Sequence, residues 1–214
     1  MPILKPSTSF NREEIANIIT HGIGFLLFAG ASPILLKFAA KSGTWYQILG
    51  LGIFCLSLLM VYSSSTIYHS ILDQKLKGIF QKIDHICIYF LIAGTHTPFL
   101  LLYLNKPYGW AFLVFLWTIA LIGILYKIFF MGRYKKLSLW LYIFMGWSAI
   151  FTIPLMFEQM NSNTIYGLVG GGLSYSLGTI FFVWEKLPFN HAIWHVFVIG
   201  GSLGHFLALF YCFV

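Results

Sequence analysis

The sequence predicts an all-α integral membrane protein, built as a bundle of seven transmembrane helices. Of its 214 residues, 59% are hydrophobic and 9% are charged, whereas a soluble domain carries about 25% charged residues. A backbone that crosses hydrocarbon must close its hydrogen bonds within helices or a closed barrel. The apolar runs are long and lack the alternating segments of about ten residues that barrel strands show. We therefore expect helices.

The seven predicted spans are apolar stretches of about 20 residues, the length that crosses a bilayer. They are His21–Ala40, Tyr46–Ile71, Ile83–Leu104, Trp110–Phe130, Leu139–Phe157, Thr164–Trp184 and His191–Phe213. The polar breaks between them are too short to hold a second domain. We therefore expect a short cytoplasmic N-terminal segment, residues 1–20, and one transmembrane domain, residues 21–214.

The N-terminal segment is expected to stay attached and to lead into the first helix. Met1 to Asn17 has no apolar core ahead of a small-residue cleavage site, so a cleavable signal peptide is not expected. Asn11, followed three residues later by Glu14, resembles a helix-capping pair. This pair indicates a helix start at the membrane surface.

Basic residues predict that the N-terminus is cytoplasmic and the C-terminus outside. In that orientation ten of the 13 Lys and Arg residues lie on the cytoplasmic side, in agreement with the positive-inside rule. The remaining three are Lys37, Lys41 and Lys106. This asymmetry and contact with anionic membrane lipids account for the net charge of +7. No nucleic-acid partner is expected.

Five polar residues inside these spans form the strongest functional pattern. They are Ser65 and His69 in Ser65-x-x-x-His69, Asp84, and the pair in His191-Ala-Ile-Trp-His195. Polar groups buried in a membrane protein are usually functional. The predicted topology puts all five near the cytoplasmic ends of the second, third and seventh spans, so three helices bring them to one depth.

The spacing of these residues suits a metal ion. Residues four apart share a helix face, so His191 and His195 can bind one ion together, with His69 completing the site from another helix. Three neutral imidazoles with an open fourth position are typical of catalytic zinc. Asp84 would bind the ion or hold its water. Ser65 lies one turn from His69 and points the same way.

Each of these residues can also be explained without a metal ion. A histidine in a span can hydrogen-bond between helices, and Ser65 can bond back to the carbonyl of Val61. Asp84 can be an acid at a helix start, favoured there by the helix dipole. The common depth favours the metal site, because an ionised Asp within a span costs up to about 2.5–3.5 kcal/mol unless it is partnered.

The other motifs are expected to be structural or accessory. His21 is a candidate partner of the site, and His96 and His205 are expected to hydrogen-bond between helices. The pairs Gly167-x-x-x-Gly171 and Gly200-x-x-x-Gly204 should let helices approach closely. We also expect helix kinks or ends at three prolines, and packing as small apolar residues for three cysteines. These are Pro33, Pro98, Pro154, Cys55, Cys87 and Cys212.

The order of these motifs resembles the bacterial hemolysin III branch of the progestin and adipoQ receptor (PAQR) family, over nearly the whole chain. The matching segments are Thr20-His21-Gly22-Ile23-Gly24, Ser65-x-x-x-His69, Asp84-His85, Gly94-Thr95-x-Thr97-Pro98 and His191-x-x-x-His195. The resemblance implies a seven-helix bundle with its N-terminus inside. It also implies Zn²⁺ bound by His69, His191 and His195, with Asp84 holding the water on the metal.

The resemblance places the chain near alkaline ceramidases and other proposed membrane hydrolases. We therefore expect hydrolysis of an amide or ester bond in a lipid-like substrate, with Asp84 handling the proton of the water and Ser65 a developing oxyanion. Two alternatives stay open. One is a receptor or sensor in which zinc only locks the bundle, and the other is a cytolytic pore, which the hemolysin name suggests.

Overall fold

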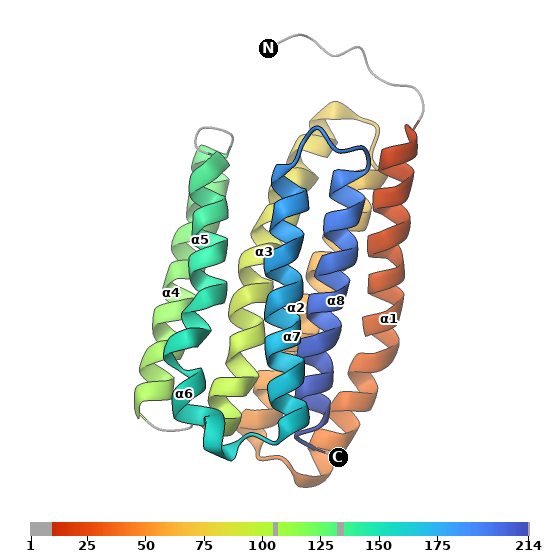
Figure 1. The fold of residues 1–214 in the computed structure, drawn as a ribbon. Helices are drawn as coiled ribbons and strands as arrows, with labels where there is room; N and C mark the ends of the chain where they lie inside the picture. The colour runs from red at the N-terminus through yellow and green to blue at the C-terminus, as the bar shows by residue number, and fades with distance from the viewer. Residues whose placement is uncertain (1–9, 105–106, 132–134, 214) are drawn as a thin grey trace.

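Seven helices of the described chain are long and apolar enough to cross a membrane, as predicted. The computed structural model describes residues 10–104, 107–131 and 135–213, and the helices run roughly parallel to one another as a bundle (Figure 1). The elements are α1 (Arg12–Ser42), α2 (Trp45–Ser70), α3 (Gln74–Tyr103), α4 (Pro107–Phe130), α5 (Lys135–Trp147), α6 (Ile153–Met156), α7 (Ser162–Val183) and α8 (Asn190–Phe210), with 3₁₀ turns η1 (Ser148–Phe151) and η2 (Phe157–Gln159). Large apolar side chains cover the outer faces, among them Leu26, Val114 and Phe129. The protein is therefore a multi-pass membrane protein.

Two helices begin nine residues earlier than the apolar pattern predicts. α1 begins at Arg12, where the Asn11 side chain accepts a hydrogen bond from the backbone N–H of Glu14 at 2.7 Å, which confirms the predicted cap. α3 begins at Gln74, where Asp73 caps the N–H of Leu76 at 2.8 Å. A hydropathy pattern registers only the apolar part of a helix, whereas capping carries these two helices into the polar interface.

The fifth span is interrupted near Pro154, as expected for a proline that kinks or ends a helix. Pro154 has no N–H, and its ring excludes the carbonyl of Ile150 from an α-helical position. α5 accordingly ends at Trp147, and the chain continues through η1, α6 and η2. Pro33 and Pro98, by contrast, lie inside the continuous helices α1 and α3.

Of the helices that carry the predicted site, α2 and α3 are the most buried spans and pack against each other, whereas α8 packs mainly against α7 and α1. α7 and α8 pack closely against each other, and their glycines explain why. A Cβ added to Gly167 would lie 2.6 Å from the carbonyl oxygen of Gly204, and one added to Gly171 would lie 2.9 Å from that of Gly201. The prediction of close approach is confirmed for these helices, and Gly200 also faces α7, at the side chain of Ser174.

α1 starts at one end of the bundle and α8 finishes at the other (Figure 1), as an odd number of spans requires. The ends of α2 and the starts of α1 and α8 therefore lie together at one end. Part of the predicted N-terminal segment, residues 1–9, and three of the basic residues used to predict orientation lie outside the described residues. Those three are Lys5, Lys106 and Arg133.

Candidate metal centre

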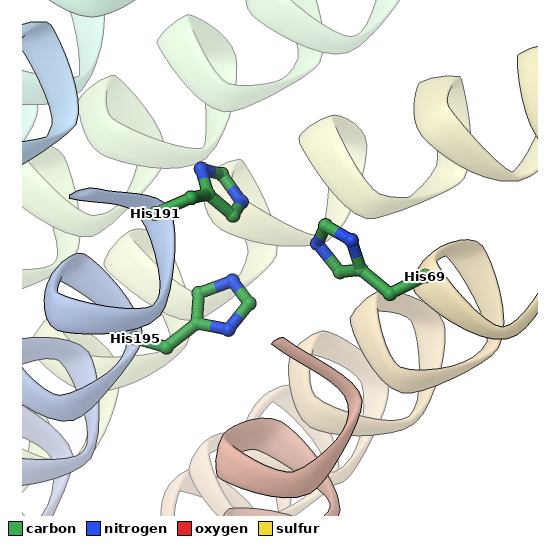
Figure 2. A group of neighbouring side chains, drawn as sticks. All are labelled: His69, His191 and His195. Atoms are coloured by element: carbon green, nitrogen blue, oxygen red, sulfur yellow. The ribbon is translucent and has the colours of Figure 1, made fainter. Parts of the chain in front are cut away.

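Three histidines from two helices come together at the end of the bundle where α1 begins. His69 comes from the last turn of α2, and His191 and His195 come from the first turns of α8. Each offers a ring nitrogen, and these three nitrogens lie within 4.8 Å of one another. Figure 2 shows the rings facing one another across a common space. This grouping can hold a metal ion, as the spacing predicts.

The donor set and its burial fit a metal such as zinc. His69 and His195 are 4% and 1% exposed, and His191 is half-buried. The Nε2 atom of His69 is buried with no hydrogen-bond partner anywhere in the described chain, and a buried polar atom without a partner is costly. Zinc–nitrogen bonds of about 2.0–2.1 Å place tetrahedral ligands roughly 3.3 Å apart. The three nitrogens, now within 4.8 Å of one another, would have to move closer together to bind zinc.

α1 supplies the groups that contact the far sides of these rings. Glu14 Oε2 lies 2.5 Å from His69 Nδ1, and the other carboxylate oxygen accepts a hydrogen bond from Lys77 Nζ at 2.6 Å. Thr20 Oγ1 lies 3.0 Å from His195 Nδ1. Each of these rings therefore uses Nδ1 for a protein contact, which leaves Nε2 for an ion.

Asp84 and Ser65 lie next to each other on α3 and α2. Asp84 is 8% exposed and Ser65 is 1% exposed. The Ser65 hydroxyl neighbours the Asp84 carboxyl, but it falls short of hydrogen-bond geometry and finds no partner in the described part of the chain. The Asp84 carboxylate is outside the three-histidine group. The structure therefore does not place Asp84 among the candidate ligands.

Two of the alternative readings are wrong. Ser65 does not bond back to Val61; it is Ser64 that donates to that carbonyl, at 3.2 Å. Asp84 is not an acid at a helix start, because α3 begins ten residues earlier at Gln74 and Asp73 is its cap. A buried carboxylate in the third turn of a helix gains little from the dipole, which acts within the first turn.

Lys127 on α4 is a buried counter-charge that the sequence analysis did not single out. It is 7% exposed, interacts electrostatically with Asp84, and places its Nζ 5.8 Å from the ring centre of Tyr142. From sequence alone it is indistinguishable from a lysine that marks the end of a span. Because an ionised carboxylate is stable inside a membrane protein only when partnered, Lys127 supports an ionised Asp84.

The remaining histidines have different roles. His21 lies against the site as expected, stacked on His195 with ring centres 3.4 Å apart, and neither of its nitrogens has a partner within the described residues. His205 Nε2 contacts the Leu168 carbonyl of α7 at 3.2 Å, which confirms the predicted interhelical bond. The same prediction is wrong for His96, because its Nδ1 contacts the Ile92 carbonyl within its own helix at 2.9 Å.

The chain matches known proteins over nearly its whole length. The sequence model described as haemolysin-III related matches residues 10–206. Hemolysin-3 of Bacillus cereus is 48% identical over 205 residues, covering 95% of this chain and 94% of that protein. The Hemolysin-3 homolog of Bacillus subtilis is also 48% identical, covering 94% and 95%. The human monocyte to macrophage differentiation factor is 30% identical, covering 92% and 83%.

Proposed function

Because the chain belongs to the haemolysin-III-related family, the hemolysin III branch of the PAQR family, we propose that it is a zinc-dependent membrane hydrolase. Its substrate would be a lipid-like molecule with an amide or ester bond. The observation that carries this proposal is the three-histidine group, whose buried His69 Nε2 has no partner in the described chain, at the same end of the bundle as Asp84 and Ser65.

In this proposal His69, His191 and His195 hold the metal, and the other residues act on the water and the substrate. When bound, a zinc ion with three histidine ligands polarises a carbonyl and lowers the pKa of its water to about 7. The Asp84 carboxylate orients the attacking water and accepts its proton. The Ser65 hydroxyl, which neighbours the Asp84 carboxyl, would donate to a developing oxyanion.

The burial of the site suggests how a substrate reaches it. His191 is half-buried, whereas His69 and His195 are buried. A substrate would therefore approach over His191, between helices and from the lipid. With the predicted orientation, this approach lies at the inner leaflet of the bacterial plasma membrane.

The proposal is tested with purified full-length protein in detergent or bilayers, either zinc-loaded or stripped with chelator. Both forms are incubated with extracted membrane lipids and added ceramides, and mass spectrometry records any new fatty acids and amines. Zinc-dependent release is expected. Asp84→Asn should retain the metal and lose activity by about 10²–10⁴-fold, the usual contribution of a general base. Protein with stoichiometric zinc that hydrolyses no lipid would refute the proposal.

The two alternatives predict different results in the same preparation. If zinc only locks the bundle, His195→Ala would lower thermal stability with no activity to lose. A lytic pore would release dye from liposomes in a metal-dependent way. The interior of the described bundle is filled by apolar side chains such as Phe28, Phe54 and Leu58, so we rank a pore formed by one chain below the other two functions.

A further inference from the structure

α1 contributes no ligand to the three-histidine group, yet it contacts the region of all three. We propose that the first turns of α1 hold the ligands in the metal-binding geometry, with Glu14 and Thr20 as positioning residues. This inference rests on the metal centre proposed above. It assigns a task to Glu14 and Thr20, which lie outside the ligand set.

Glu14 fixes which nitrogen of His69 is available. An ionised carboxylate can only accept hydrogen bonds, so its 2.5 Å contact puts the ring proton on Nδ1 and leaves the lone pair on Nε2. The amide of Asn17 lies farther from the same nitrogen, at 3.4 Å. Lys77 holds the second carboxylate oxygen at 2.6 Å. A carboxylate behind a metal-binding histidine orients the ring and makes it a stronger ligand.

Thr20 does the same for His195 through a different arrangement. Its hydroxyl has one proton, and the backbone carbonyls of Ala16 and Asn17 lie 2.8 and 3.0 Å from Oγ1 as acceptors for it. With that proton engaged, Oγ1 can only accept from His195 Nδ1 at 3.0 Å. The lone pair of His195 is therefore also on Nε2. His21, stacked on the same ring, restricts its rotation from one side.

The third ligand is connected to α1 through the backbone ahead of it. Glu13 Oε1 accepts a hydrogen bond from the N–H of Phe189 at 3.0 Å, two residues before His191. Phe189 has φ 57° and is the one non-glycine residue with positive φ in the described chain. That conformation is unfavourable for a bulky side chain, so an external contact is needed to hold the turn from which α8 begins.

A simpler reading is that these are ion pairs and hydrogen bonds that fasten α1 to its neighbours. Glu14 and Lys77 are only partly buried, and an ion pair near the surface contributes little by itself. However, Glu14 contacts His69 and Thr20 contacts His195, two different ligands. Both contacts engage Nδ1 and so leave Nε2 available to the space that the ligands share. Positions 13, 14, 17, 20 and 21 recur at helical spacing along one face. If these contacts only fastened α1 to its neighbours, they would not need to leave the same nitrogen available on both rings.

The test uses full-length protein in detergent, stripped of metal and titrated with Co²⁺, whose visible spectrum reports the geometry of its ligands. Glu14→Gln and Thr20→Val are expected to weaken Co²⁺ binding by about 10–100-fold and to alter the spectrum. Thr20→Ser keeps the hydroxyl, so this variant should show the Co²⁺ affinity and the spectrum of the wild type. The matched control is Glu158→Gln, which removes an exposed acid in η2, at the opposite end of the bundle.

Each outcome decides a different point. Wild-type affinity and spectrum in both Glu14→Gln and Thr20→Val would overturn the role of α1 and leave the metal centre intact. Weakened binding that Thr20→Ser does not restore would also overturn it, because the loss would then be a packing effect. A wild-type protein that binds no metal would overturn the metal centre itself, and this role with it.

Discussion

Metal binding should stabilise the folded protein because the site joins two helices that otherwise meet little. His69 is on α2 and the other two ligands are on α8, and these helices make few direct contacts. A notable link between them is the hydrogen bond from Tyr62 to Ser202, at 2.8 Å. An ion bound by all three histidines would add a second bridge at the end of the bundle. Helix separation at that end would then require release of the metal.

The expected size follows from ligand linkage. Free zinc at 100 times its dissociation constant stabilises the folded state by about 2.7 kcal/mol. For a chain of this size, that corresponds to a rise of roughly 5–10 °C in the midpoint of thermal unfolding. His191→Ala is the sharpest perturbation, because His191 is the least buried of the three ligands and its loss leaves the smallest packing defect.

The assay is thermal unfolding in detergent with and without zinc, for the wild type, His191→Ala and Glu158→Gln. The wild type and Glu158→Gln should show the full rise on zinc addition, and His191→Ala should show almost none. An equal rise in His191→Ala would refute the reasoning, because the stabilising ion would then be bound elsewhere. The absence of a rise in all three would refute the bridging role.

Two further predictions concern the counter-charge of Asp84 and the packing of α7 against α8. Lys127→Met removes the counter-charge of Asp84 and should reduce zinc-dependent hydrolysis at least tenfold, while the zinc content stays constant. Full activity in this variant would show that the ionised form of Asp84 does not depend on Lys127. Gly171→Ala should destabilise the protein by about 1–3 kcal/mol, because its Cβ would lie 2.7 Å from His205 Nε2 and 2.9 Å from the Gly201 carbonyl oxygen. Its control, Gly170→Ala, meets nothing within 4 Å and should be neutral or stabilising in thermal unfolding; equal effects of the two substitutions would contradict this account of α7–α8 packing.

The fold was predictable because a bilayer imposes strong constraints on sequence. Spans must be apolar and about 20 residues long, and this requirement located all seven helices. It could not locate helix starts that extend into the polar interface. Those starts depend on single capping side chains, Asn11 and Asp73, of which the sequence analysis recognised only the first.

The candidate ligands were predictable for a related reason. Histidines inside apolar helices are conspicuous, and the i, i+4 pair His191 and His195 shares a face by helix geometry alone. The residues behind them were harder to recognise. Glu14 lies in a polar segment where an acid is unremarkable, and its contact with His69 depends on how α1 packs beside α2. The available signal was the set of positions 13, 14, 17, 20 and 21, which are linked by i, i+3 and i, i+4 spacing. It becomes meaningful only once the partner helix is known.

Buried charge was the other feature that the sequence could not specify. Lys127 ends an apolar span and was counted as a cytoplasmic marker, yet it points inward toward Asp84 and Tyr142. Which way a residue at the end of a helix faces depends on the rotation of that helix in the bundle. That rotation is set by packing against neighbouring helices rather than by local sequence.

The most direct test of the central claim is the metal content of the purified protein. Elemental analysis should find about one zinc per chain in the wild type, the stoichiometry of a single three-histidine centre. His69→Ala and His191→Ala, which remove a ligand from α2 and from α8, should each lose most of it. Unchanged metal content in both variants would contradict the assignment of the site.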